Sequence, residues 1–560
     1  MTKSIFTFLF ILFALNASAQ YYGWSKTIGG TDADTCVALT IDNQANLYAI
    51  GSFSGYGDFR NDTIKDNLIS NGKDDVFLQK RSKKGKYIWS KKIGGKGNDR
   101  PSSMIYYNGS LFITGTFEDT LDFGIQKIIP QGKKSIFLAK MDTAGNCLWV
   151  KTLGDTLYSR ARSLAINKDG IYLSGEFSGK IEKTAYINSM FLQKRDLNGN
   201  VNWTKTFGAK RSVVSNSITL DSLGNLFNVG SLLGNNVDFD PSPIKDSILS
   251  STTNGLSDIF IQKVNANGDL FWVKKIGGSA ADEANTIISK GNEIYVSGYF
   301  SLTVDFDPSL IGISNLSSKG GKDIFIGKYD LSGKLLWIKQ IGNTKEETAK
   351  QLEIDKYKNI YLVGTFNTSS GSSTDFLGKS LSTSGNNDAF LLKFDVTGKG
   401  ILVKQYNGSG SDYGSAIKAD TMYNVYIAGS YSGNLNIVGA TKGYSSTGSS
   451  DVFIYKSLLL PTSDDILVGK DTSGVSIFEN TLNFSIYPNP VLNELKLSFE
   501  PLSGSSSVSI TSISGQILLQ KEFSTGQTEE NINTSDFTPG IYFVKLTSGV
   551  SSYTHKIHKL

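Results

Sequence analysis

A sevenfold internal repeat constrains this 560-residue chain more than any other feature. Each copy contains an anchor segment in which an aromatic residue is followed by Lys and Gly, as in GWSKTIGG from Gly23 and FWVKKIGG from Phe271. The seven anchor positions span 378 residues with a mean spacing of 63, and they are Trp24, Trp89, Trp149, Trp203, Trp272, Trp337 and Leu402. A repeat of about this length is typical of propellers, solenoids and arrays.

Three further segments recur within each copy. The first copy contains VALTID at 37–42, LYAIGSF at 47–53 and DVFLQK at 75–80, and a D-x-x-G turn then leads most copies back to the next anchor segment. These segments are short, alternate at period two and are rich in Ile, Val, Phe and Tyr, which predicts strands. Four strands per copy in seven copies predict an all-β fold, a seven-bladed β-propeller. The central Gly of the second strand is interpreted as a place where adjacent blades approach too closely for a Cβ.

The two ends of the repeat region are complementary. The expected mature chain begins with a lone anchor strand at 23–28, whereas the seventh copy ends after its third strand, Asp451 to Lys456. We therefore predict that residues 23–28 complete the last blade and remove an exposed sheet edge. The recurring W-x-K-x-I-G-G, GN-x-YV-x-G and D-x-F-x-x-K segments of residues 20–460 resemble those of bacterial secreted β-propeller repeat proteins.

The N-terminus has the pattern of a secretory signal peptide. Residues 1–19 contain one Lys, an apolar run from Ile5 to Leu15 and the small-residue segment Ala17-Ser18-Ala19. A retained membrane anchor is the alternative, but the run is about half of the roughly 20 residues that a membrane-spanning helix needs. We expect a mature extracytoplasmic chain without a transmembrane segment. Cys36 and Cys147 lie in different repeats and are interpreted as isolated small apolar residues.

The C-terminal part differs from the repeats. A polar linker at 461–483 precedes a second domain at 484–560, in which short strands and tight turns predict a small β-sandwich. This domain resembles the type A (Por-type) C-terminal sorting domain of type IX secretion cargo at Tyr487, Pro488, Asn489, Pro490, Asn493, Gly515, Gly540, Tyr542 and Lys556. The resemblance implies the type IX secretion machinery as a partner, a Bacteroidota-type bacterium as the source, and a location outside the cell or on its surface. A carbohydrate-binding accessory sandwich is the alternative.

Charge and composition exclude several function classes. The net charge of +5 is spread over the whole length without a basic stripe, so we expect no nucleic-acid partner. Both histidines, His555 and His558, lie at the C-terminal end, so chemistry elsewhere would depend on carboxylates, hydroxyls, Lys, Arg or Tyr.

An acidic residue follows the anchor segment at the same position in five copies. These residues are Asp34, Asp99, Asp282, Glu347 and Asp412, and copies three and four have Ser159 and Val213 instead. If the loops converge near the propeller axis, the carboxylates form a partial ring that binds a cation or sugar hydroxyls. The alternative is that each carboxylate caps a local turn or pairs with a neighbouring Lys.

A second candidate is a repeated Asp-Phe-Asp-Pro motif. Asp238 and Asp240, and again Asp305 and Asp307, are two residues apart on an extended segment, so their side chains point the same way, as calcium chelation would require. Two carboxylates fall short of the six to eight oxygens that calcium takes, and an Asp-Pro turn that ends a strand is the alternative. Calcium is the one cofactor that the sequence suggests.

A lysine recurs in all seven third strands and is interpreted as a blade-stabilising or edge-protecting residue, because a unique active site would break the repeat. The sequence contains no catalytic motif, which favours a binding or adhesion module for a glycan or protein. The alternatives are a secreted glycan hydrolase or lyase that uses two channel carboxylates, and a purely structural surface component.

Overall fold

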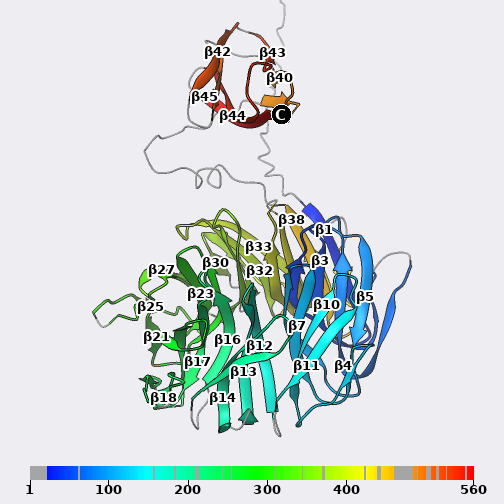
Figure 1. Cartoon of the computed structure of the whole chain (residues 1–560), viewed down its shortest axis with the longest axis vertical. Helices are drawn as coiled ribbons and strands as arrows, with labels where there is room; N and C mark the ends of the chain where they lie inside the picture. Colours follow the sequence, from blue (N-terminus) through cyan, green and yellow to red (C-terminus); the bar gives the residue numbers. More distant parts are fainter. Residues whose placement is uncertain are drawn as a thin grey trace, which may run out of the picture. The chain divides into compact units, whose positions relative to one another are not determined.

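A computed structural model of the chain describes residues 22–60, 64–154, 158–181, 184–208, 213–242, 244–253, 255–309, 311–342, 345–368, 373–421, 424–437, 443–458, 484–488, 490–499, 506–512, 516–524, 526–548 and 551–559. Every regular element in these residues is a β-strand (Figure 1). The chain divides into two compact units, Met1–Gly469 and Lys470–Leu560. The predicted signal peptide at 1–19 and linker at 461–483 lie outside the described residues. Within the described part of the chain, no helix is long and apolar enough to cross a membrane.

The first unit consists of four-stranded antiparallel sheets, which we call blades. Blade 1 contains β2 (Asp34–Ile41), β3 (Leu47–Asp58), β4 (Asn67–Arg81) and β5 (Tyr87–Ile93), each paired with the strand before it. Blades 2 to 6 have the same strand order. Blade 2 consists of β6 (Arg100–Tyr107), β7 (Ser110–Phe117), β10 (Ser135–Asp142) and β11 (Cys147–Leu153), and blade 3 of β12 (Tyr158–Asn167), β13 (Gly170–Ile181), β14 (Thr184–Arg195) and β15 (Val201–Phe207). Blade 4 consists of β16 (Val213–Leu220), β17 (Leu226–Leu233), β20 (Ser257–Val264) and β21 (Leu270–Gly278), blade 5 of β22 (Glu283–Lys290), β23 (Glu293–Phe300), β26 (Asp323–Asp330) and β27 (Leu335–Ile341), and blade 6 of β28 (Glu347–Ile354), β29 (Ile360–Phe366), β32 (Asp388–Phe394) and β33 (Gly400–Gly408).

Short two-stranded hairpins interrupt several blades between their second and third strands. They consist of β8 (Leu121–Asp122) with β9 (Lys127–Ile128), β18 (Val237–Asp238) with β19 (Ile248–Leu249), β24 (Thr303–Asp305) with β25 (Asn315–Ser317), β30 (Thr374–Phe376) with β31 (Lys379–Leu381), and β36 (Asn434–Ile437) with β37 (Tyr444–Ser445).

The last blade joins the two ends of the propeller sequence. It contains β34 (Asp412–Ala419), β35 (Asn424–Tyr431), β38 (Asp451–Leu458) and, as its fourth strand, β1 (Tyr22–Gly30). β1 runs antiparallel to β38 with Trp24 opposite Lys456, and Figure 1 shows the two strands side by side. This is the pairing that the complementary ends of the repeat predict, and it satisfies the backbone groups along the edge of β38.

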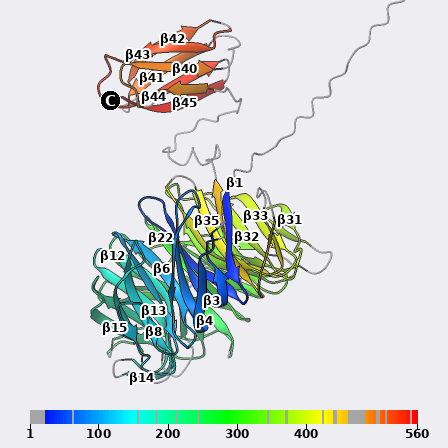
Figure 2. The same cartoon turned by 90° about the vertical axis from the view of Figure 1, so that its right-hand side faces the viewer.

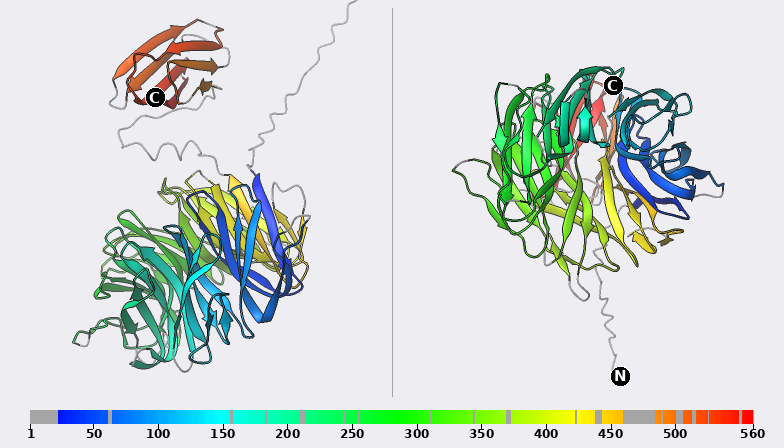
Figure 3. Two further views of the ribbon diagram at one scale, coloured as in Figure 1. Left: turned by 45° about the vertical axis from the view of Figure 1, so that its right-hand side comes forward. Right: turned by 90° about the horizontal axis from the view of Figure 1, so that it is seen from below.

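The first strands of the blades form the innermost layer. They contact one another in the order β2, β6, β12, β16, β22, β28, β34 and back to β2. The right-hand view of Figure 3 shows the sheets arranged around a common axis in the order of the sequence. The pairings of the described residues make up seven blades, and the predicted all-β propeller class is confirmed.

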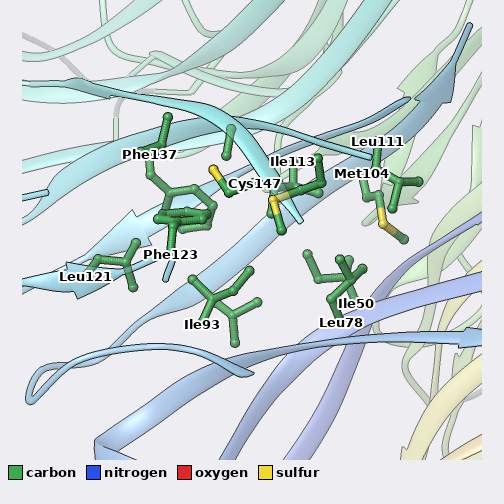
Figure 4. Close-up of a cluster of buried hydrophobic side chains, with 14 of the residues drawn as sticks. Ile50, Leu78, Ile93, Met104, Leu111, Ile113, Leu121, Phe123, Phe137 and Cys147 are labelled. Atoms are coloured by element: carbon green, nitrogen blue, oxygen red, sulfur yellow. The ribbon is translucent and has the colours of Figure 1, made fainter. Parts of the chain in front are cut away.

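The hydrophobic cores lie between adjacent blades. One cluster combines Ile50 and Leu78 of blade 1 with Met104, Ile113 and Phe137 of blade 2, all at most 4 % exposed (Figure 4). The other propeller clusters likewise contain residues of two successive blades, and one joins blade 7 to blade 1. A blade buries both faces in this way, which explains why its central strands are almost continuously apolar.

The central Gly of each second strand has a different role from the predicted one. A Cβ at Gly51 would lie 1.9 Å from the carbonyl oxygen of Thr35 and 2.6 Å from the Phe77 ring, and both neighbours belong to the same blade. The prediction of close approach between adjacent blades is therefore wrong. The glycine instead accommodates a β-bulge, because the pairing of β2 with β3 shifts register between Cys36 and Ala38, beside Gly51.

The anchor tryptophans pack on the glycine turns of the next blade. A Cβ at Gly145, which has φ of +81°, would lie 2.9 Å from the Trp89 ring. The same relation pairs Trp24 with Gly85, Trp149 with Gly199, Trp203 with Gly268, Trp272 with Gly333 and Trp337 with Gly398. The glycine is therefore needed both for its left-handed backbone conformation and for the indole that covers it.

The recurring third-strand lysines also connect blades. Lys80 Nζ donates to the carbonyl oxygen of Thr143 in the next blade at 3.2 Å and lies 4.9 Å from the centre of the Tyr48 ring. Lys263 and Lys456 donate in the same way to Leu331 and Lys83. These contacts confirm the blade-stabilising interpretation of this lysine.

The second unit contains two sheets around one core. The smaller sheet consists of β39 (Phe484–Tyr487), β40 (Glu494–Phe499) and β43 (Glu529–Asn533). The larger sheet consists of β42 (Ile517–Phe523), β41 (Ser506–Ser512), β44 (Gly540–Ser548) and β45 (Ser551–Lys559), and Figure 2 shows both. Leu495 and Leu497 of one sheet and Val508 and Val544 of the other are fully buried, as in a small β-sandwich.

Candidate functional site

The five predicted ring carboxylates lie at blade junctions. Each stands at or directly before the start of an innermost strand, and each is at most 1 % exposed. Asp34 Oδ2 accepts the backbone N–H of Gly30 at 2.9 Å, and Asp99 Oδ2 and Asp282 Oδ2 accept those of Gly95 and Gly278. The turn-capping alternative therefore describes Asp34, Asp99 and Asp282, whereas neither carboxyl oxygen of Asp412 has a hydrogen-bond partner among the described residues. Because the ring carboxylates are buried, a ligand would reach them only if the junctions opened.

Each ring carboxylate is next to a second acidic residue in the third strand of the preceding blade, at or near the start of that strand except for Asp75, which lies within the longer β4. The backbone N–H of Asp34 donates to Ser450, the neighbour of Asp451, and that of Asp99 donates to Asp74, the neighbour of Asp75. The same backbone hydrogen bond places Asp282 beside Asp258, Glu347 beside Asp323 and Asp412 beside Asp388. Ten acidic side chains are thus arranged as five buried pairs.

The two remaining junctions lack both acids. Ser159 follows the same backbone pattern, and its neighbour in the preceding blade is Ser135. A Cβ at Gly154 would lie 3.0 Å from Ser159 Oγ and 3.3 Å from Ser135 Oγ, so the two hydroxyl groups lie near the same point beside Gly154. At the junction of blades 3 and 4 the corresponding residues are Ser189 and Val213, both buried. An acid at one position is therefore always accompanied by an acid at the other.

The paired carboxyl groups are poorly satisfied as anions. Within the described residues, Oδ1 of Asp34, Asp451, Asp75 and Asp99 has no hydrogen-bond partner. Burial and the negative charge of Asp451 raise the pKa of Asp34 to about 8. Burial, together with the partner carboxyl, also raises the pKa of Asp412 to about 8 and that of Asp99 and Asp282 to about 7. These groups are suited to hold protons inside the junctions.

The second candidate motif forms turns. Asp238 Oδ1 accepts the backbone N–H groups of Asp240 and Ser247, both at 2.9 Å. Asp305 Oδ1 accepts those of Asp307 and Ser314, and Asp240 and Asp307 in turn accept Ser242 and Ser309. The described residues contain no group of three or more His, Cys, Asp or Glu side chains that could hold a metal ion. The structure thus places these four aspartates as the turn alternative predicts.

The phenylalanine between the two aspartates of this motif packs against the third strand of its blade. Phe239 and Phe306 are fully buried, and their rings lie 5.0 Å and 4.9 Å from those of Phe260 and Phe325 in the third strands. Phe59, Phe123 and Phe376 make the same contact in other blades. The Asp-Phe motif therefore attaches a hairpin to its blade.

A second set of inner-strand residues lies at the β-bulges. One residue of every first strand is skipped where that strand shifts register opposite the central Gly. We call these residues the bulge ring; they are Val37, Ser102, Arg162, Asn216, Asn285, Lys350 and Ser415. Bulges redirect side chains and are frequent next to functional sites.

Small polar members of the bulge ring connect successive inner strands. Asn216 Nδ2 donates to the carbonyl oxygen of Ala284, Asn285 Nδ2 to that of Ala349, and Ser415 Oγ to that of Cys36. Each acceptor directly precedes the bulge residue of the next blade. The bulge ring is therefore one level of the innermost layer, at which neighbouring blades contact each other.

Arg162 and Lys350 depart from this pattern. Arg162 Nη2 donates to Glu176 Oε1 of its own blade at 2.9 Å, and its Nε–H has no acceptor among the described residues. Lys350 is exposed and has no hydrogen bond or ion pair within the described part of the chain. Glu283, two residues before Asn285, accepts hydrogen bonds from Asn216 and from the hydroxyl of Tyr299.

The charges of this level act on one another across the ring. The pKa of Lys350 in blade 6 is lowered by partial removal from water and then by the positive charges of Arg162 and Arg160 in blade 3, while Glu283 in blade 5 opposes the shift. Arg160 is exposed, two residues before Arg162. Two arginines of blade 3 and one carboxylate of blade 5 thus act electrostatically on Lys350 of blade 6, and at the bulge position the other five copies have neutral residues.

Reasoning from the sequence missed this cluster. The five acidic positions attracted attention because they recur, yet they belong to the repeat and serve the junctions. Arg162 and Lys350 are charged where the other copies have neutral residues at the bulge position, and this departure from the repeat at one fixed position is the signal that finds them. Glu283 lies two positions before the bulge residue of its copy. Arg160 adjoins Ser159, one of the two positions at which the acidic pattern is broken.

The predicted sorting-motif residues lie in the second unit. Tyr487 ends β39 and is about half exposed, Pro488 and Pro490 follow it, and the carbonyl of Asn493 accepts the backbone N–H of Thr534. Gly540 begins β44, and Tyr542 is buried with its hydroxyl donating to the carbonyl oxygen of Thr538 at 2.7 Å. Lys556 belongs to β45. Asn489 and Gly515 lie outside the described residues.

Residues 485–559 match the family described as the secretion system C-terminal sorting domain. This match covers nearly all of the second unit and supports the resemblance that the sequence predicts there. A C-terminal domain of this family indicates a secreted protein.

Two curated proteins are similar to part of this chain. An uncharacterized WD repeat-containing protein of Acanthamoeba polyphaga mimivirus is 24 % identical over 424 residues, which cover 62 % of this chain. The regulatory protein FlaEY of Caulobacter vibrioides is 23 % identical over 394 residues, which cover 64 % of this chain. The matched regions make up 29 % and 40 % of the lengths of those two proteins.

Solved structures with some similarity include two glycan-related proteins. The parainfluenza virus 5 hemagglutinin-neuraminidase ectodomain matches with a TM-score of 0.33 and 11 % identity, covering 64 % of this chain and 82 % of the viral one. A mutant of Trypanosoma rangeli sialidase that displays trans-sialidase activity matches with a TM-score of 0.30 and 8 % identity, covering 81 % of this chain and 82 % of the sialidase.

Proposed function

We propose that this chain is a binding protein of the bacterial cell surface or surroundings, exported by the type IX secretion machinery of a Bacteroidota-type bacterium. The signal peptide at 1–19 would direct passage across the inner membrane, and the C-terminal domain at 484–560 would direct passage across the outer membrane. The propeller at 20–460 would then serve as a recognition module for a glycan or protein. Calcium is not required by this proposal.

The observation that carries the binding role is the break in repeat symmetry at the bulge ring. The seven inner strands could be exchanged for one another with little effect if the propeller were only a scaffold. Instead, Arg162 and Lys350 are charged where the other copies have neutral residues, and they lie in the innermost layer, where propellers commonly bind ligands.

Export can be tested by deletion of residues 484–560 in the native bacterium. We expect the shortened chain to remain in the periplasm, while the full chain with the same epitope tag is detected on the cell surface or in the medium. Normal amounts of the shortened chain outside the cell would refute the sorting role, and would favour an accessory sandwich.

Binding can be tested with the mature chain, residues 20–560, on an array of bacterial, plant and animal glycans, together with a search for protein partners at the cell surface. We expect saturable binding to a defined ligand. Any bound glycan should be recovered intact after prolonged incubation. Release of shorter products would instead support the alternative of a glycan hydrolase or lyase, and no saturable binding to any glycan or protein would favour a purely structural role.

A further inference from the structure

The unpaired cations of the innermost layer point to a ligand class. Resting on the proposed binding function, we propose that Arg160, Arg162 and Lys350 bind an anionic group, a carboxylate or sulfate, carried by an acidic oligosaccharide.

The first support is unbalanced charge. Arg160 and Lys350 have no hydrogen bond or ion pair within the described residues, and only Arg162 has a carboxylate of its own, Glu176. The carboxylate of Glu283 is occupied by two neutral donors, Asn216 Nδ2 at 2.7 Å and Tyr299 Oη at 2.9 Å. Like charges that approach one another without a counter-ion are unfavourable, so an anion at this level would relieve repulsion as well as form hydrogen bonds.

The second support is preorganisation. The ion pair with Glu176 restrains the Arg162 guanidinium while leaving its Nε–H without an acceptor. Asn285, Ser415 and their neighbours hold the surrounding inner strands together by hydrogen bonds across the junctions. The cationic groups are thus presented from a rigid layer rather than from loops, which reduces the entropy lost on binding.

The third support concerns the kind of molecule that carries the anion. The inner-strand residues two positions before the bulge ring include Thr35, Thr348 and Tyr413, and the Tyr413 side chain is 45 % exposed with its hydroxyl held by Asn387. Hydroxyl groups with one exposed aromatic ring suit a sugar, whereas a protein partner generally needs an apolar interface core. An acidic oligosaccharide therefore fits this surface better than an acidic peptide.

The inference can be tested by calorimetric titration of the mature chain with four probes at low salt. The probes are a galacturonate hexasaccharide and a sulfated galactose hexasaccharide, each compared with the neutral galactose hexasaccharide, and a hexaglutamate peptide. Lys350→Met and Arg160→Met remove one positive charge each from the cluster. Lys290→Met is the matched control, because Lys290 lies at the opposite end of an innermost strand, β22, and its replacement removes the same charge.

We expect at least one acidic hexasaccharide to bind, and the neutral one to bind at least about tenfold more weakly. Lys350→Met and Arg160→Met should each weaken that binding by about tenfold or more, while Lys290→Met leaves it unchanged. The preference for the carboxylate or the sulfate probe identifies the anionic group. Unchanged melting temperatures of the two variants would show that lost binding does not reflect unfolding.

Several results would overturn this inference. They are binding of the neutral hexasaccharide alone, binding of neither acidic hexasaccharide, equal losses in Lys290→Met and Lys350→Met, or tighter binding of hexaglutamate. The proposed binding function would survive each of these results if the chain retains another saturable ligand, and it fails separately if no glycan or protein ligand is found at all.

Discussion

Asp34 and Asp451 come from opposite ends of the propeller sequence and form a buried carboxyl pair where the ring closes. The backbone N–H of Asp34 donates to the carbonyl oxygen of Ser450 at 2.9 Å, and the Asp451 side chain accepts the backbone N–H of Thr447. Both Oδ1 atoms lack a partner among the described residues. An equivalent arrangement of two acidic residues occurs at four other junctions. The free energy of unfolding therefore depends on the protonation of these carboxyl groups.

The first prediction concerns the dependence of stability on pH. The pKa of Asp34 and Asp412 is about 8 and that of Asp99 and Asp282 about 7 in the folded chain, all above the ordinary value of an aspartate. The folded state therefore holds more protons than the unfolded state between about pH 4 and pH 8, and the free energy of unfolding falls as pH rises through this range. We expect the melting temperature to decrease by roughly 5 °C or more between pH 5 and pH 8.5.

On the acid side the sign reverses. Hydrogen bonds from Asn200 lower the pKa of Asp196, so its contribution is lost as pH falls below the ordinary aspartate value. A melting-temperature profile with its maximum in the mildly acidic range would agree with both effects. A profile that rises steadily from pH 5 to pH 8.5 would contradict the proton-holding pairs.

The second prediction concerns Asp34→Asn. The amide keeps an oxygen that accepts the N–H of Gly30, removes the titration of Asp34, and adds an N–H that can donate to the unpartnered Oδ1 of Asp451. We expect a higher melting temperature than that of the unchanged chain at pH 8.5, by about 2 °C or more, and a smaller difference at pH 5. Scanning calorimetry at the two pH values measures both effects.

Asp169→Asn is the control for this substitution, because Asp169 is an exposed carboxylate and its replacement changes the net charge equally. A gain in stability of the same size in both variants would show that net charge, and not the Asp34–Asp451 pair, is responsible.

The third prediction concerns the contact between Trp89 and Gly145. In Gly145→Ala the new methyl group would lie 2.9 Å from the Trp89 ring, in addition to adopting a φ of +81°. The control Gly109→Ala has a φ of +78° but meets nothing within 4 Å, so it costs only the backbone strain, about 1 kcal/mol. We expect Gly145→Ala to lower the free energy of unfolding by a further 1 kcal/mol or so, from overpacking. Equal losses in urea-unfolding experiments would mean that the indole moves aside without cost.

The fourth prediction concerns closure of the ring by β1. A chain that starts at residue 31 lacks β1, so the edge of β38 and the cluster around Trp24 and Ile28 become exposed. We expect a marked loss of thermal stability and concentration-dependent association, measured by light scattering, because an unpaired strand edge binds other chains. A chain that starts at residue 20 is the control. Identical melting and a monomeric state of the two chains would show that β1 is dispensable.

Loss of the seventh tryptophan illustrates what the repeat could reveal by itself. Leu402 is the anchor of β33 in blade 6. In the next blade the third strand is β38 and the fourth is β1, which comes from the other end of the chain. Because β38 and β1 are not consecutive in the sequence, no glycine turn connects them. An indole at position 402 would therefore have no turn to cover. The sequence shows the substitution, and the packing of Trp337 on Gly398 and its counterparts supplies the reason.

The sequence by itself determined the local and repeated features: the strands, their order within a blade, the complementary ends and the C-terminal domain. Each of these depends on alternation, turn residues or motifs over short stretches, and the repeat presents the same pattern many times. It also drew attention to Asp34 and its counterparts, but left open whether they face a ligand or a turn.

Only the tertiary structure decided which residues meet across blades. The pairing of Asp34 with Asp451, and the electrostatic effect of Arg162 on Lys350, join positions that are far apart in the sequence and belong to different copies. The order and curvature of the blades in the ring determine such contacts, and the residue pattern of a single strand does not predict them. For this reason the repeated acids proved to be buried junction residues, and the charged cluster emerged only where the repeat is broken.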